Sequence, residues 1–156
     1  AVSDQVKRIN VRSAEQMFTE VQRHYSDADS FISAAAVADF RVADIAEQKI
    51  KKQSDAEEMT LRLVKNPDIV AWVAQQEDKP YVVGFAAETQ NVIEYAKDKL
   101  QRKNLDMICA NQVGETLGFE QNDNALTLIT SKQELELPLA SKDELAVQIL
   151  KFISAK

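Results

Sequence analysis

The feature that most restricts the fold is an alternation of short apolar runs with longer amphipathic segments. The apolar runs cover residues 31–37, 81–86 and 106–111. A continuous apolar run of this length is typical of a strand buried on both faces of a parallel sheet, and the intervening segments are long enough for crossover helices. The alternation predicts an α/β protein with a three-layer, mostly parallel, Rossmann-like sheet and helices on both faces.

Helix-capping signals and shorter runs complete the predicted element order. Ser13 and Ser141 each precede a Gln or Glu by three residues, which is the capping-box pattern, and Asn66 and Asn91 are further candidate N-caps. Helices are expected after these residues, and they should end near residues 23, 153, 75 and 103. Strands are also expected over 5–11 and 59–64, and the runs 125–129 and 134–137 predict a C-terminal antiparallel hairpin.

The composition limits the setting and the partners. The 156 residues suit a single domain over 1–156, and no apolar run approaches the roughly 20 residues of a membrane helix. A net charge of −6 disfavours non-specific nucleic-acid binding. The single cysteine, Cys109, lies in an apolar run and is expected to be buried and inert, and no signal-like stretch opens the chain. We therefore expect a cytoplasmic protein that binds neither membranes nor nucleic acid.

A lysine cluster is the first candidate for chemistry. Residues 41–58 are polar and charged without sustained periodicity, which predicts a mobile loop, and this loop contains Lys49, Lys51 and Lys52. A movable group of positive charges suits phosphates, whose charge must be masked in a transition state. An ordinary solvated charge run explains the same residues, so the cluster alone does not decide between the two readings.

Further candidates lie where ligands of open α/β sheets bind, beyond the carboxyl ends of the strands. Asp39 follows the first apolar run and could contact a nucleotide or a metal, although it could equally cap a loop. Asn66 and Pro67 predict a helix start whose free N–H groups, over 67–70, suit an anion. Lys99 and Lys103 share a helix face and could reach one anion, or they could simply complement the helix dipole.

Five motifs along the chain together resemble a known family. They are, in order, Ala34–Arg41 (AAAVADFR), Lys49–Lys52 (KIKK), Val64–Val70 (VKNPDIV), Val83–Thr89 (VGFAAET) and Arg102–Asn111 (RKNLDMICAN). In this order they closely resemble bacterial phosphopantothenoylcysteine synthetase. That domain is the C-terminal half of a bifunctional coenzyme A biosynthesis protein whose other half is a flavin-dependent decarboxylase.

The resemblance implies an amide-forming ligase. CTP would activate the carboxylate of 4′-phosphopantothenate as an acyl-cytidylate with release of pyrophosphate, and the amine of L-cysteine would then displace CMP. The resemblance also implies Mg²⁺ and a homodimer, with flavin confined to the decarboxylase half. Lys49 matches the family's catalytic lysine, and no metal ligand is assigned. The positions that match nucleotide contacts are Ser33, Asp39, Lys49, Pro67, Asp68, Ile69, Val70, Phe85, Lys99 and Lys103.

The chain also departs from the family pattern. It contains only three glycines, Gly84, Gly114 and Gly118. The family's opening strand, its glycine-containing phosphate loop and an asparagine that assists acyl-cytidylate breakdown would all precede Ala1. An alternative is therefore a nucleotide-binding or self-associating fragment without activity of its own. A nicotinamide-dependent oxidoreductase fits the architecture, but the chain lacks a Gly-x-Gly-x-x-Gly motif.

Overall fold

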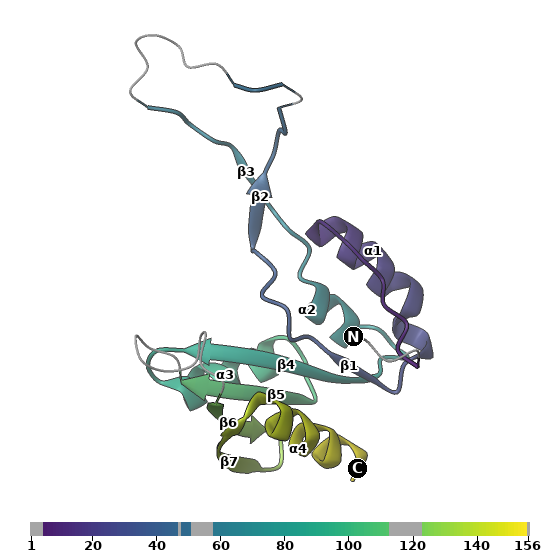
Figure 1. Cartoon of the computed structure of the whole chain (residues 1–156), viewed down its shortest axis with the longest axis vertical. Coiled ribbons are helices and arrows are strands. Elements are labelled where there is room, and N and C mark those ends of the chain that lie inside the picture. Colours follow the sequence, from purple (N-terminus) through teal and green to yellow (C-terminus); the bar gives the residue numbers. More distant parts are fainter. Residues whose placement is uncertain (1–4, 47, 51–57, 113–122, 156) are drawn as a thin grey trace. The chain divides into compact units, whose positions relative to one another are not determined.

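The computed structural model describes residues 5–46, 48–50, 58–112 and 123–155, and the chain forms two compact units (Figure 1). The first unit consists of Ala1–Arg23 and Ala36–Ile69, and the second consists of His24–Ala35 and Val70–Lys156. The expectation of a single domain over 1–156 stays a prediction.

The second unit is built on a five-stranded sheet with the strand order β1-β4-β5-β6-β7. β1, β4 and β5 are parallel, whereas β6 is antiparallel to both β5 and β7. The predicted C-terminal hairpin is thus confirmed as β6 and β7. The bounds of the strands are β1 (Ser30–Ile32), β4 (Tyr81–Glu88), β5 (Met107–Gln112), β6 (Asp123–Ile129) and β7 (Glu134–Ser141).

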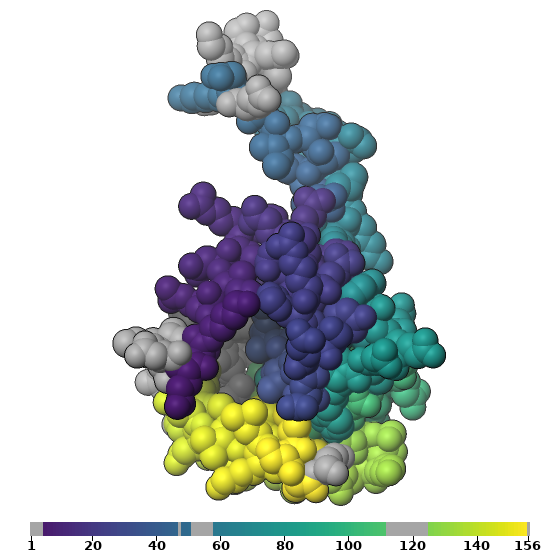
Figure 2. Space-filling model, turned by 90° about the vertical axis from the view of Figure 1, so that its right-hand side faces the viewer, coloured from purple at the N-terminus to yellow at the C-terminus, as the bar shows by residue number. Residues whose placement is uncertain are grey.

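Two helices cover opposite faces of this sheet (Figure 1). α3 (Val92–Arg102) buries Ala96 and Leu100 and packs against β4 and β5. α4 (Lys142–Ser154) packs against β6 and β7 and lies at the surface of its unit, where it is yellow in Figure 2. The layered arrangement confirms the α/β prediction of a sheet with helices on both faces.

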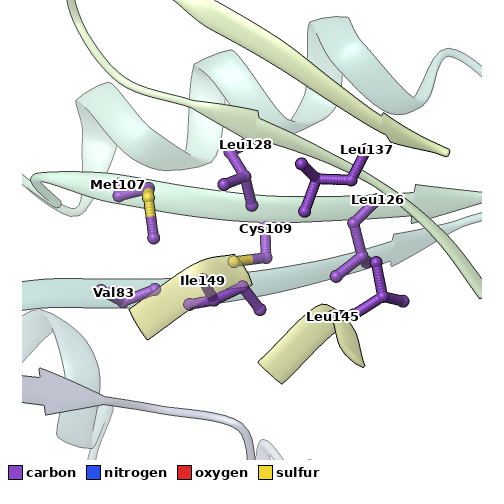
Figure 3. Packing of buried hydrophobic residues seen from close by; sticks show 8 residues of the cluster. All are labelled: Val83, Met107, Cys109, Leu126, Leu128, Leu137, Leu145 and Ile149. Atoms are coloured by element: carbon purple, nitrogen blue, oxygen red, sulfur yellow. The ribbon is translucent and has the colours of Figure 1, made fainter. Parts of the chain in front are cut away.

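The main core of the second unit lies between the sheet and α4 (Figure 3). Burial in this core raises the pKa of Cys109 to about 12, so its thiol stays neutral and unreactive near physiological pH. Cys109 is therefore a packing residue, as its apolar surroundings in the sequence predicted. The buried members of the cluster are Val83, Met107, Cys109, Leu126, Leu128, Leu137, Leu145 and Ile149.

The first unit contains most of α1 (Ala14–His24) and a two-stranded antiparallel sheet of β2 (Phe40–Val42) and β3 (Leu63–Lys65). We call this two-stranded sheet the ribbon. Ser13 caps α1 as predicted, because its Oγ accepts the backbone N–H of Gln16 at 3.1 Å.

The short helices η1 (Tyr25–Asp27) and α2 (Ile69–Ala74) complete the described elements.

Three strand predictions differ from the structure. The strand expected over 59–64 begins only at Leu63, because β3 covers Leu63–Lys65. Residues 5–11 form no strand, because no described segment pairs with them. The apolar run 31–37 forms a strand only as far as Ile32, and β1 lies at an edge of the sheet with β4 as its neighbour. An edge strand lacks a partner on one side, and alanines 34–36 are accordingly exposed rather than buried.

The predicted loop and two of the predicted caps also differ from the structure. Residues 41 and 42, expected to be loop, belong to β2 because they pair with β3. Asn66 does not cap α2, which begins only at Ile69, because the Asn66 amide is used elsewhere. Asn91 precedes α3 in a left-handed conformation, with φ 49°, and makes no side-chain cap. By contrast, the capping box of Ser141 and Glu144 is confirmed at the start of α4.

Candidate functional site

Four of the candidate residues lie together in the second unit, on β4, on α3 and just beyond β1. The backbone N–H of Ser33 donates to the Val83 carbonyl oxygen at 2.9 Å, so the chain leaving β1 stays against β4. Two residues further along β4, the carbonyl oxygen of Phe85 accepts a hydrogen bond from Lys99 Nζ at 2.8 Å. Lys103 follows Lys99 by one helical turn and is the C-cap residue directly after α3. The half-buried ammonium group of Lys99 is therefore held close to the carboxyl end of β1.

Val70 belongs to the same unit but to a different element. It lies in α2, whose residue Ala74 accepts a hydrogen bond from Asn104 Nδ2 at 2.8 Å. Asn104 directly follows Lys103 and has a positive φ of 56°, a backbone conformation that asparagine tolerates better than most residues. The end of α2 is therefore tied to the end of α3.

The other candidates lie in the first unit, around the base of the ribbon. Asp39 precedes β2, and Pro67, Asp68 and Ile69 follow β3. The backbone N–H of Asn66 donates to the carbonyl oxygen of Asp39 at 2.8 Å, which holds the two segments side by side. Asp39 and Asp68 are exposed, whereas Ile69 is buried. The ribbon thus brings together two segments that are 27 residues apart, counted from Asp39 to Asn66.

The catalytic candidate Lys49 lies on the segment that joins β2 to β3, and its side chain is exposed. Lys51, Lys52, Gly114 and Gly118 fall outside the described residues. In the parts of the chain that the structure describes, no three His, Cys, Asp or Glu side chains lie close enough together to hold a metal ion. No helix among the described residues combines the length and apolar character needed to cross a membrane.

The structure therefore gathers the predicted nucleotide contacts into two groups, one in each unit. Their convergence on one ligand stays a prediction. Sequence reasoning missed two residues at the base of the ribbon, Arg41 and Asn66, which bond to the segments carrying the candidates. A charged residue at the start of a predicted loop and an asparagine beside a proline were the available signals, and both have common structural explanations.

Comparison with known proteins identifies the family. The model of the DNA/pantothenate metabolism flavoprotein C-terminal domain matches residues 1–156. The chain belongs to this family. Its relatives include the coenzyme A biosynthesis bifunctional protein CoaBC of Vibrio vulnificus strain CMCP6, which is 56% identical over 95% of this chain and 37% of its own length. CoaBC of Escherichia coli K12 is 50% identical over 93% of this chain and 36% of its own length.

A solved member of the family has the same fold. The crystal structure of the C-terminal domain of CoaBC matches with a TM-score of 0.73 and 36% sequence identity. The match covers 93% of this chain and 63% of that domain. The chain thus spans little more than a third of the length of the curated CoaBC relatives.

Proposed function

We propose that this chain forms part of a phosphopantothenate–cysteine ligase that uses CTP and acts in coenzyme A biosynthesis. The names of the CoaBC relatives support the pathway, and the five ordered motifs support the reaction. The structural observation that best supports the proposal is the hydrogen bond from Lys99 to the Phe85 carbonyl oxygen. It holds a cation where ligands of α/β sheets bind, close to the carboxyl end of a parallel strand.

The proposed chemistry explains why cations are needed. In the first step, a carboxylate oxygen of 4′-phosphopantothenate attacks the α-phosphorus of CTP, and the bond to pyrophosphate breaks. In the second step, the amine of L-cysteine attacks the acyl carbon, loses a proton and releases CMP. The first step brings a carboxylate against a triphosphate, so positive groups that mask the growing charge lower the barrier. We assign that role to Lys49, and nucleotide binding to Lys99 and Lys103.

Magnesium is part of the proposal as an ion that accompanies the triphosphate. The described residues contain no cluster of three potential ligand side chains, and we therefore assign no residue as a metal ligand. Mg²⁺ usually keeps several waters and binds through substrate phosphates and one or two carboxylates.

The catalytic assignment is tested by Lys49→Gln in the full-length protein, assayed for phosphopantothenoylcysteine formation from CTP, 4′-phosphopantothenate and L-cysteine. We expect the rate to fall on the order of 10² to 10³, the loss typical of one donor that stabilises transition-state charge. Lys7→Gln, at another exposed lysine of the same unit, is the matched control and should keep the wild-type rate. Near-normal turnover by Lys49→Gln rejects the assignment.

The alternative function is a nucleotide-binding module that lacks activity of its own. The chain spans little more than a third of the length of the CoaBC relatives, and the alternative concerns the chain taken by itself. Calorimetric titration of the chain with CTP and Mg²⁺, followed by a turnover assay, separates the two functions. Binding without turnover supports the module, whereas turnover rejects it.

We further propose that the full-length protein is a homodimer and that the ribbon takes part in the contact. The register puts Phe40, Val42 and Leu63 on one face of the ribbon, together with Lys65. Leu61 lies two residues before β3, and all four apolar side chains are exposed. An isolated two-stranded sheet is marginally stable in water, and its free edges invite pairing with another chain. A second ribbon related by a two-fold axis presents the same apolar face and covers it.

A further inference from the structure

Asn66 is a buried polar residue at the base of the ribbon. Its exposed fraction is 8%, and Thr130 in the second unit is the other buried polar residue in the described part of the chain. Burying an amide is costly unless its donors and acceptor are used. The bonds that Asn66 makes therefore indicate what the residue is for.

Asn66 links three different points of the ribbon base. Its side-chain Nδ2 donates to the Ala38 carbonyl oxygen at 2.8 Å, and its backbone N–H donates to the Asp39 carbonyl oxygen at 2.8 Å. Its Oδ1 accepts a longer bond, 3.3 Å, from Arg41 Nη1. Two consecutive carbonyl groups before β2 are thus bound by one residue after β3.

Arg41 strengthens the same link from the opposite strand. Its Nη1 also donates to the Lys65 carbonyl oxygen at 2.9 Å, and its Nη2 lies 2.8 Å from Glu15 Oε1. The bond to Lys65 fixes the backbone immediately before Asn66. The pair with Glu15 is partly exposed, and exposed ion pairs contribute little to stability.

The linked segments are the ones that carry the nucleotide candidates of this unit. Asp39 is bonded directly, and Pro67, Asp68 and Ile69 follow Asn66 without interruption. One donor and the acceptor of the Asn66 side-chain amide are engaged in these internal bonds, and the residue is buried. We therefore take its effect on a ligand to act through the position of its neighbours.

We propose that Asn66 and Arg41 are positioning residues that set the spacing between Asp39 and the 67–69 segment for nucleotide binding. The inference rests on the proposed function, because it takes CTP as the ligand. An amide is required at residue 66, because a carboxylate would put an oxygen atom against the Ala38 carbonyl oxygen in place of a donor. Asn66→Asp therefore breaks one bond while keeping the size of the side chain.

The test compares Asn66→Asp with wild type in the full-length protein, using calorimetric titration with CTP and Mg²⁺ together with steady-state kinetics. We expect the Kd and the KM for CTP to rise about tenfold, because part of the binding free energy must then restore the spacing that the bond from Asn66 to Ala38 holds in the wild type. The KM for L-cysteine should stay unchanged. A generally loosened protein would instead raise both KM values.

Matched controls separate positioning from stability. Thr130→Ala removes the other buried polar side chain, which bonds to Lys132 and Gln133 in the turn after β6, and it should leave the KM for CTP unchanged. Glu15→Gln weakens the partly exposed ion pair with Arg41 and should also leave the KM for CTP unchanged. If Asn66→Asp does not fold, Arg41→Gln provides the same comparison.

Three results would overturn the inference, and they are distinguishable. A wild-type protein that binds no CTP rejects the proposed function and this inference together. Wild-type binding with an unchanged Kd in folded Asn66→Asp or Arg41→Gln rejects this inference alone, and so does an equal rise in both KM values.

Discussion

Lys99 and Lys97 lie two residues apart on α3 and have different partners. Lys99 donates to the Phe85 carbonyl in a partly buried setting, whereas Lys97 pairs with Glu134 on the surface. Only Lys99 is therefore held beside β4, where the nucleotide is proposed to bind. The equal charge of the two lysines makes them a matched pair for mutation.

Lys99→Met in the full-length protein is expected to raise the Kd for CTP about tenfold, because a charge-assisted bond contributes roughly 1.5–3 kcal/mol. Lys97→Met should change the Kd less than about twofold, since its partner is an exposed carboxylate. Calorimetric titration measures both values. Equal effects of the two substitutions would contradict the assignment of Lys99.

The spacing of Lys99 and Lys103 predicts that they share a helix face, because helical periodicity is a local property. The partner of Lys99 could not be predicted, since it depends on how α3 packs against β4. The partners of Asn66 could not be predicted either, because they are also distant in the sequence. Its position before a proline is typical of a helix cap, but the carbonyl groups it binds lie 27 and 28 residues earlier in the chain.

The elements that the sequence predicts best are those with local signals. α4 begins at Lys142 with Ser141 as its cap, as the capping box indicates. β1 and α2 were predicted poorly, because the length of β1 depends on its edge position and the start of α2 on the bonds of Asn66. Strand 40–42 has no strong local signal and exists because residues 63–65 pair with it.

Ser141→Ala should destabilise the second unit by about 1 kcal/mol, the usual cost of losing a helix N-cap. The Ser141 hydroxyl, followed by its backbone N–H, lowers the pKa of Glu144 below the usual 4.5. A carboxyl group with a lowered folded pKa stabilises the fold above pH 4.5, and this contribution is lost as the pH falls through the folded value. The difference between wild type and variant should therefore shrink in acid.

Urea unfolding of the two proteins at pH 7 and at pH 3 measures this difference. Ser154→Ala is the control on the same helix, because Ser154 Oγ bonds to the Leu150 carbonyl in the exposed last turn. It should change the free energy of unfolding by less than about 0.5 kcal/mol. A Ser141→Ala effect no larger than that of the control would argue against the cap.

For the whole molecule, the ribbon predicts how copies associate. Leu63 on the ribbon and Leu150 on α4 are almost equally exposed, at 54% and 53%, so they form a matched pair. Leu63→Glu should weaken the proposed dimer on the order of 10³-fold, because about 2 kcal/mol of apolar burial is lost at each of two symmetric positions. Sedimentation of the full-length protein measures the mass.

Leu150→Glu should leave the mass and its concentration dependence unchanged. A Leu63→Glu protein that still sediments like wild type would show that the ribbon is not the contact. The sequence alone could not predict this surface, because exposed apolar side chains on one face of a ribbon are recognised only after the two strands have been paired in register.

The burial of Cys109 has a consequence for a protein proposed to handle free cysteine. Disulfide exchange begins with attack by a thiolate, and it requires access to the sulfur atom. Cys109 is fully buried, and its pKa of about 12 keeps the sulfur protonated. The folded chain therefore does not form mixed disulfides with cystine at this residue, and oxidation of the substrate pool leaves its core intact.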